Sequence, residues 1–428
     1  MSVNSQMSGW LLLAASCAGV AAAQASLPAV VTIEQAVAEA VQNNPGLQAE
    51  RLGIAVAETG VITAGLRPNP VLSYSNGYLD WLGTRANTDN NAAPTETALR
   101  VDLPIERGHK RDLRLENAGF GRTIAEAKLA DSIRRLRLDV TLACIDVMEA
   151  KARLALANDN LRSLNGIVRL NQARLDGGAI APVELTRSRV AMLQFRANVT
   201  TAELGLATAR TKLHTLLGRR GNSNLVDVAG EMNVSLPPQV PDLQQIQATA
   251  VSARPDLQAV RLDQTRSQAE LRLQLAQGKI DYTVGMEYRR QQGVNGRGNS
   301  LGLFFSAPLP VYNRNQGEIA RVRAAQEQGR KTLDALEAQI NGEVSTAYQE
   351  FESARSLVAE IERDLLKPSE EARTTTAYVY QAGASSLTDV LDAQRAFNET
   401  MSAYYGAEAA YRRAAIQLSS VVGQEVIP

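Results

Sequence analysis

The sequence contains few of the residue types from which catalytic and metal sites are built. It has 2 His and 2 Cys among 428 residues, and His109 and His214 are too far apart in the sequence to indicate a shared metal site. No phosphate-binding loop and no pairing of a nucleophile with a base occurs along the chain either. We therefore expect a protein that is not an enzyme and that uses no cofactor or metal.

The sequence also has no excess of charge of either sign, and it has few aromatic residues. The 45 basic residues balance 45 acidic ones, so no net field favours nucleic acid as a partner. Aromatic residues make up 4% of the chain, while Ala, Leu, Gln, Arg and Glu are frequent. This bias is typical of long helices packed on helices, and it predicts an elongated, mainly helical molecule.

Long hydrophobic runs are absent after the N-terminus. The first apolar run, residues 10–23, is too short to span a bilayer and is followed by small residues, so we expect a signal peptide in residues 1–25. Lipidation at Cys17 is an alternative, although Ala14 stands where a lipoprotein signal has Leu. If the signal peptide is removed, Cys144 is the one cysteine of the mature chain, which excludes an intramolecular disulfide. Because no later run could form a membrane helix, entry into a membrane would require strands.

The chain consists of two related halves. Three segments recur, namely residues 44–49 at 254–259, residues 103–105 at 309–311, and residues 213–218 at 418–423. Such a duplication fixes the architecture before any motif is considered. We therefore expect a first repeat over residues 26–217, an irregular equatorial connector over 218–241, and a second repeat over 242–428. In each repeat the order is helix, two strands, long helix, glycine turn and returning helix.

The long helices carry a heptad pattern. From Leu129 to Leu175, the positions spaced alternately four and three residues apart are apolar except for Asn171. Sustained spacing of this kind predicts coiled-coil packing against a partner helix. A helix over residues 110–175 would be about 100 Å long at 1.5 Å per residue.

Each long helix ends at a glycine turn. Glycine stops the first helix at Gly178, and Pro182 stands early in the helix that returns. Gly383 occupies the equivalent place in the second half. We therefore expect helical hairpins with tips near residues 176–182 and 381–387.

Two segments in each half alternate apolar and polar residues. They predict strands, with one apolar and one charged face, over residues 70–80, 97–106, 281–290 and 300–308. A soluble, half-buried sheet would show the same period. Polar loops rich in Gly and Asn join the strands of each pair, as in outer-membrane barrels, and five aromatic residues are candidates for a membrane girdle: Tyr74, Tyr78, Trp81, Tyr282 and Tyr288. Since four strands cannot close a barrel and lipid tolerates no open edge, insertion would require several copies of the chain.

With these residues in view, the chain resembles the TolC-like outer-membrane efflux family. The resemblance rests on the duplication, the helix starts at Asn44-Pro45 and Arg254-Pro255, and residues 380–394, which contain the turn YQAG followed by LTDVLDAQ. Residues 309–319, with the sequence LPVYNRNQGEI, look like the branch of heavy-metal (cobalt-zinc-cadmium) resistance pumps.

The resemblance implies a mainly α fold with a small β part. Long coiled-coil hairpins would form an α-barrel, and four strands from each chain would contribute to a trimeric twelve-stranded transmembrane β-barrel. The protein would be the passive exit duct of a tripartite efflux pump, with heavy-metal cations as cargo. The implied partners are two further copies, a periplasmic adaptor, a proton-driven inner-membrane pump and outer-membrane lipid. The implied location is the outer membrane with a periplasmic extension.

The resemblance also implies roles for the hairpin tips. Asp389 and Asp392 would ring a periplasmic constriction, Glu184 would be the acidic counterpart in the first half, and Tyr380 would help hold the mouth shut. Ser385 replaces a basic latch residue of well-known members, so no charge pair can form there. The expected adaptor contacts are Gly178, Ala179, Ile180, Gly383, Ala384, Ser385 and Leu387.

The sequence is also consistent with purely structural roles for these tip residues and with other functions for the chain. Asp389 is equally interpreted as a helix N-terminal residue and Asp392 as part of a solvated face, while the tip residues could merely close the hairpins. The same architecture would serve a duct for drug efflux or type I secretion. A periplasmic coiled-coil adaptor or a soluble scaffold belongs to a different class, and an adaptor needs only one hairpin, whereas this chain has two.

Overall fold

The computed structural model describes residues 29–77, 96–221, 225–230, 232, 242–293 and 296–426. The predicted signal peptide with Cys17, the girdle candidates Tyr78 and Trp81, and most of the predicted connector lie outside these residues.

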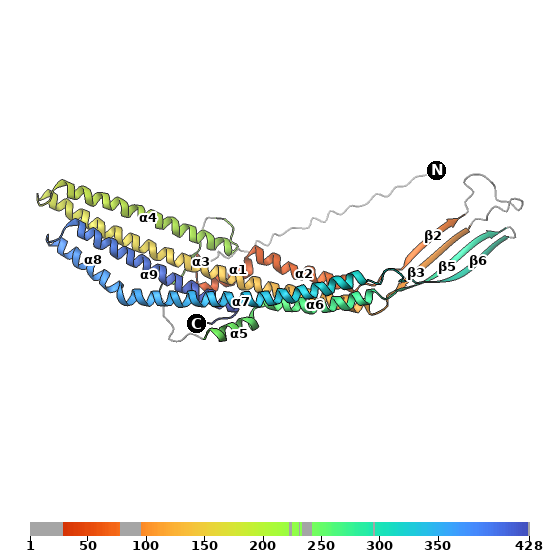
Figure 1. Cartoon of the computed structure of the whole chain (residues 1–428). Coiled ribbons are helices and arrows are strands. Elements are labelled where there is room, and N and C mark those ends of the chain that lie inside the picture. Colours follow the sequence, from red (N-terminus) through yellow and green to blue (C-terminus); the bar gives the residue numbers. More distant parts are fainter. Residues whose placement is uncertain are drawn as a thin grey trace, which may run out of the picture.

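The molecule is a long rod with a sheet at one end and the tips of two helical hairpins at the other (Figure 1). Its helices are α1 (Ile33–Asn43), α2 (Pro45–Gly65), α3 (Lys110–Asp176), α4 (Pro182–Leu216), α5 (Leu243–Ala253), α6 (Pro255–Gln277), α7 (Gln316–Asp364), α8 (Leu366–Gln381) and α9 (Leu387–Val422). Its strands are β1 (Val30–Val31), β2 (Val71–Gly77), β3 (Glu96–Ile105), β4 (Asp227–Val228), β5 (Tyr282–Gly293) and β6 (Gly296–Ser306).

Helix α3 is unbroken over 67 residues, which corresponds to about 100 Å. It ends at Gly177 and Gly178, and the φ of +72° at Gly178 is one that a side chain would disfavour. Pro182 then occupies the first turn of α4, where its missing N–H leaves no hydrogen bond unmade.

The equivalent helix of the second half is broken. Helix α7 ends at Asp364, and α8 begins after Leu365, whose φ is −119°. The sequence places the irregularity at Pro368, and the break lies just before it because a proline ring clashes with the carbonyl four residues earlier. That residue is Asp364.

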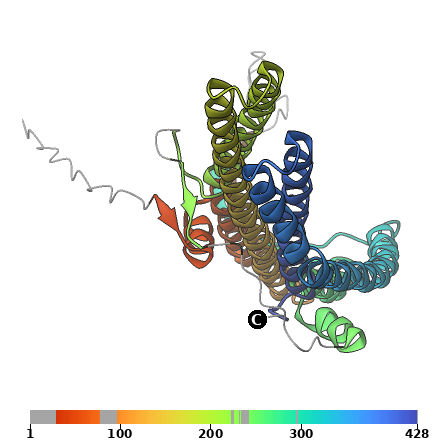
Figure 2. The ribbon, with the colours of Figure 1, turned by 90° about the vertical axis from the view of Figure 1, so that its left-hand side faces the viewer.

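The helices form a curved row whose order changes along the rod. Near the sheet the order is α2, α3, α6, α7, and toward the tips α3 lies between α4 and α9, which packs on α7 and α8. Since α6 and α9 both lie on the α7 side of α3, helices α2 and α4 share one lateral edge of the chain. Figure 2 shows these rows from the tip end.

Besides two smaller clusters toward the tips, two large apolar cores among the described residues hold the rod together. One surrounds Val140 and Leu213 of α3 and α4, and the other surrounds Phe351 and Leu418 of α7 and α9. Cys144 is buried in the first core, and this burial raises the pKa of its thiol to about 12. Strands β1 and β4 pair in parallel beside that core. None of the helices in the described part of the chain is both long and apolar enough to cross a membrane.

The backbone preserves the internal duplication. Among the described residues, His109 and Asn315 are the two non-glycine residues with positive φ, and each immediately precedes a long helix, α3 or α7. They lie at the same place in the two repeats. Gly218 and Gly423, which follow α4 and α9, also share a positive φ. The two halves therefore use the same unusual backbone conformations at matching positions.

Candidate functional site

The four-stranded sheet joins the two repeats. Its order is β2-β3-β5-β6 with all neighbours antiparallel, so the two hairpins meet where β3 pairs with β5. Strands β2 and β6 each pair on one side only within the described chain, and the sheet therefore has two open edges.

One face of the sheet is apolar and exposed. Because paired residues lie on the same face, the register places the alternating apolar residues of all four strands in one continuous surface. Their exposed fractions run from 42% to 81% for Leu72, Tyr74, Leu99, Val101, Leu103, Ile105, Val284, Met286, Tyr288, Leu301, Leu303 and Phe305. In water, such a surface would be an association or aggregation site.

The opposite face is charged and internally paired. The Arg100 guanidinium donates to Asp102 Oδ1 at 2.8 and 2.9 Å. Arg289 lies 2.6 Å from Glu96 and 2.7 Å from Glu287. Every one of these three carboxylates therefore has an arginine partner across or along the sheet.

The tyrosines of the described sheet lie at two levels. Tyr74 and Tyr288 flank Leu99 in one row across the sheet, while Tyr282 stands opposite Ile105 near the helical end. The ring of Tyr282 is half-buried against Phe305, at 5.1 Å between ring centroids.

The second hairpin tip is fastened to helix α3. The Tyr380 hydroxyl donates to Asn171 Oδ1 at 2.6 Å, and both side chains are buried. Arg174 Nη2 donates to the backbone carbonyls of Tyr380 and Gln381 at 2.9 and 3.0 Å, and its guanidinium lies 5.1 Å from the centroid of the Tyr380 ring. Asn171 and Arg174 thus connect the first hairpin to the turn of the second.

Sequence reasoning did not assign Asn171 and Arg174 to this site. The available signal was Asn171 itself, the polar residue in an otherwise apolar heptad seam. A buried amide in such a seam needs a partner, but the heptad pattern cannot say that the partner comes from the other hairpin.

The two predicted acidic residues of α9 have different surroundings. Asp389 forms a capping box, in which its carboxylate accepts from the Ser386 backbone N–H at 3.0 Å and its own N–H donates to Ser386 Oγ. The backbone N–H of Ser386, and then the hydroxyls of Ser386 and Ser385, lower the pKa of Asp389. Asp392 points into solvent and has Arg395 at 3.5 Å. Asp389 is therefore both a helix cap and a charge at the tip.

The remaining predicted tip residues are mostly exposed. Glu184 lies in the first turn of α4 with Arg187 at 3.4 Å. Gly178, Ala179, Gly383 and Ala384 are exposed, and Ile180 and Ser385 are partly exposed. Leu387 differs from the expectation that it forms a contact surface, because it is 4% exposed and packs against Tyr380 and Val390. Its apolar side chain closes the turn from the inside.

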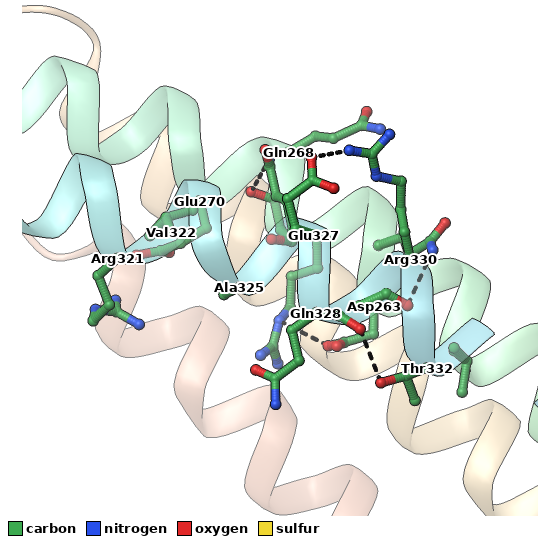
Figure 3. Close-up of a pocket in the computed structure, with 16 residues that line it drawn as sticks. Asp263, Gln268, Glu270, Arg321, Val322, Ala325, Glu327, Gln328, Arg330 and Thr332 are labelled. Atoms are coloured by element: carbon green, nitrogen blue, oxygen red, sulfur yellow. Dashed lines mark hydrogen bonds and ion pairs between the residues drawn. The ribbon is translucent and has the colours of Figure 1, made fainter. Parts of the chain in front are cut away.

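No catalytic or metal arrangement emerges from the described residues. They contain no cluster of His, Cys, Asp or Glu suited to a metal ion. A groove between α6 and α7 is lined by charged and polar residues, among them Asp263, Arg321 and Glu327 (Figure 3). Arg330 pairs with Glu327 on the same helix rather than pointing to a shared centre. The groove therefore has the character of a solvated helix surface.

Comparison with known proteins decides the family. The sequence profile of outer membrane efflux proteins matches residues 36–219 and 247–424, one segment in each half of the chain. This chain belongs to the outer membrane efflux protein family. Channels of this family work as trimers with periplasmic adaptors in tripartite pumps.

The relatives and solved structures agree with that assignment. Cobalt-zinc-cadmium resistance protein CzcC of Cupriavidus metallidurans is 24% identical over 394 residues, covering 92% of this chain and 90% of CzcC. Outer membrane efflux protein BepC of Brucella suis biovar 1 is 24% identical over 379 residues, covering 85% of this chain and 79% of BepC. The structure of CusC superposes with a TM-score of 0.72 at 18% identity, covering 92% of both chains. The outer-membrane channel OprN gives a TM-score of 0.74 at 16% identity, covering 92% of this chain and 91% of OprN.

The predicted class of protein is thereby confirmed. The chain is an outer-membrane efflux channel, a passive duct rather than an enzyme, and its fold is mainly helical with a small sheet and an internal duplication. The adaptor and scaffold alternatives are set aside by the family.

Proposed function

We propose that this channel is the exit duct for heavy-metal cations in a pump whose inner-membrane component is driven by protons. The observation that carries the membrane part of the proposal is the apolar sheet face, whose residues are exposed on all four strands. In lipid this exposure is favourable, whereas in water it is costly.

Closure of the sheet into a barrel would come from three copies. Lipid does not tolerate unpaired strand edges, so the free edge of β6 in one copy would pair with the free edge of β2 in the next. Twelve strands would then surround a pore lined by the charged face. Tyr282 and the row of Tyr74 and Tyr288 are six positions apart, about 20 Å along the strand, and we assign these tyrosines to the aromatic girdle of the sheet.

The helices offer a matching edge. Helix α4 has a second, exposed seam at heptad spacing, opposite the seam that it buries against α3; it includes Val183, Val190, Leu193 and Leu204. Helix α2 exposes Leu52, Val56 and Ile62 on the same lateral edge, and Leu66, which directly follows the helix, is also exposed. We assign both stripes to contacts with the neighbouring copy in a closed ring.

The hairpin tips would form the periplasmic mouth. Three copies of Asp389, Asp392 and Glu184 at a narrowing would concentrate negative field and favour cations. The Tyr380 contact with Asn171 would hold the mouth closed. The exposed tip residues around Gly178 and Gly383 would meet the adaptor, with Leu387 supporting them from beneath.

The targeting and boundary assignments complete the proposal. Residues 1–25 would be removed as a signal peptide, with lipidation at Cys17 as the alternative. The mature chain would divide into repeats at 26–217 and 242–428 around the connector at 218–241. The outer-membrane lipid would surround the sheet, and the rod would extend into the periplasm.

The cargo proposal rests on the relative named for cobalt, zinc and cadmium resistance. Drug export is the second candidate, favoured by the similarity to BepC, which is named an efflux protein without a metal.

Metal and drug tolerance in a deletion strain would separate the two cargo candidates. We expect loss of tolerance to cobalt, zinc or cadmium and restoration by the plasmid-borne gene. Unchanged metal tolerance together with a new sensitivity to drugs would replace the metal proposal with the drug one. Insertion of the purified trimer into planar bilayers, with ohmic channels as the expected result, tests the duct itself.

A further inference from the structure

The charged side chains of the sheet lie flat although no layer covers them. Figure 1 shows the sheet extending beyond the helices, so both of its faces are open in the single chain. Even so, the side chains of Arg100 and Asp102 are only 29% and 20% exposed. They must therefore be covered by one another and by the wall of the sheet itself.

An aromatic ring completes this covering. The Arg100 guanidinium carbon lies 4.2 Å from the centroid of the Phe304 ring, which is a cation–π geometry. Asp102 pairs with Gly285 on β5, and Gly285 pairs with Phe304 on β6. The Asp102–Arg100–Phe304 group therefore spans three strands and passes over the glycine of the middle one.

Two glycines create the room for this group. A Cβ at position 285 would overlap Asp102 Oδ1 and lie 3.3 Å from Arg100 Nε. A Cβ at position 302 would lie 2.9 Å from the Phe304 ring, closer than real side chains approach. With any other residue at Gly285 or Gly302, the Asp102 carboxylate or the Phe304 ring has to shift from this position.

The same face is nearly balanced in charge. Among the described residues of the paired strands it carries Arg100 and Arg289 against Glu96, Asp102 and Glu287, so two cations face three anions in each copy. Each carboxylate is within ion-pair distance of an arginine. Paired charges attract few mobile ions, and the excess is one negative charge per copy.

We propose that Gly285 and Gly302 keep the strand-bounded part of the duct wide by letting the Asp102–Arg100–Phe304 group lie against its wall, and that charge pairing leaves this part only weakly cation-selective. The inference rests on the proposed function, in which the charged face lines the pore. Three copies of a displaced ring and guanidinium would otherwise project into one lumen.

Gly302→Ala tests the first part by single-channel conductance in planar bilayers. Gly298→Ala is the matched control, because Gly298 lies on the same strand and face and a Cβ there meets nothing within 4 Å. We expect lower conductance for Gly302→Ala and wild-type conductance for Gly298→Ala. The double variant Gly302→Ala/Phe304→Ala has no ring to displace, so its conductance should return to the wild-type value. Equal conductance of the Gly302→Ala and Gly298→Ala trimers would overturn the role of the glycines. If Gly302→Ala does not insert, Gly285→Ala, which displaces Asp102 instead of the ring, takes its place against the same control.

The charge balance is tested by reversal potentials in a KCl gradient. Arg100→Gln leaves one cation against three anions per copy, so we expect the ratio of cation to anion permeability to rise. Asp102→Asn leaves two against two, so we expect that ratio to fall. If the permeability ratio shifts in the same direction in both variants, or in neither variant while channels still form, the inference that these residues line the pore is refuted. Absence of channels in the wild-type trimer would instead refute the proposed function.

Discussion

The Tyr380 hydroxyl makes the buried hydrogen bond that joins the second hairpin tip to α3. Removing it with Tyr380→Phe should cost the mouth about 1 kcal/mol, since the acceptor Asn171 Oδ1 is then left unpaired. We expect more frequent opening of the reconstituted channel at zero voltage. Tyr378→Phe is the control, because Tyr378 is 73% exposed two residues away. Identical open probabilities for the two variants would show that this bond does not gate the channel.

The acidic residues at the mouth should act on ions rather than on assembly. In the double variant Asp389→Asn/Asp392→Asn we expect reduced preference for cations with trimer formation retained, because both carboxylates are exposed. Selectivity of the double variant equal to wild type at pH 7 would exclude these residues as a filter.

Asp389 should also make the start of α9 sensitive to acid. The pKa of its carboxyl is depressed, so its stabilisation of the α9 cap is present above the ordinary value of 3.8 and is lost as the pH falls below it.

At this scale the sequence predicted positions better than contacts. The resemblance places Asp389 and Tyr380 at the second hairpin tip because its motif fixes their distance from the glycine turn. Asn171 and Arg174 were missed because their partners lie more than 200 residues away, a relation that no local pattern encodes. Leu387 was expected at the surface because the motif marks its position in the turn and not the direction of its side chain.

The hairpin tips are the elements that should respond to bulk. Gly383→Arg should abolish efflux while leaving the trimer intact, since the backbone there has a φ of +82° and open space around it. The backbone strain is about 1–2 kcal/mol, too little to unfold helices of this length. Gly342→Arg, at another exposed glycine with no close neighbour, is the control. Normal metal tolerance with Gly383→Arg would argue against docking at the tips.

The sheet should be sensitive to charge on one face only. Leu303→Arg adds a cation to the apolar face, where it should cost about 2–4 kcal/mol per copy near the bilayer midplane. We expect loss of the protein from outer-membrane fractions, whereas Ser300→Arg, on the opposite face of the same strand, should be tolerated. Equal membrane levels of the two variants would contradict the assignment of the faces.

The helices and strands could be predicted from the sequence because their patterns repeat regularly over many residues. Alternation over β3 and β5 and the heptads of α3 identify strand and helix without tertiary information. The break before α8 lies at Leu365 rather than at Pro368, because proline acts on the turn that precedes it. The order β2-β3-β5-β6 was not predicted, since pairing of β3 with β5 joins segments from different repeats.

On the scale of the whole molecule, the exposed seam of α4 should decide whether copies stay together. Replacing Leu193 and Leu204 by Glu should weaken the trimer while the chain remains helical, because these side chains point away from the core. Asn198→Glu adds one acid off the seam and should leave the oligomer unchanged. Size-exclusion chromatography with light scattering in detergent measures the outcome. A Leu193→Glu/Leu204→Glu protein that stays trimeric would remove α4 from the subunit interface.

The two repeats, finally, have unequal stiffness. Helix α3 runs without interruption from the sheet to the first tip, whereas the corresponding path in the second repeat has a joint at Leu365. A push applied at the first tip is therefore carried as a rigid displacement, while a push at the second can be absorbed by bending. We expect any opening movement of the mouth to be confined to α8 and the part of α9 nearest the tip, while the first hairpin stays in place.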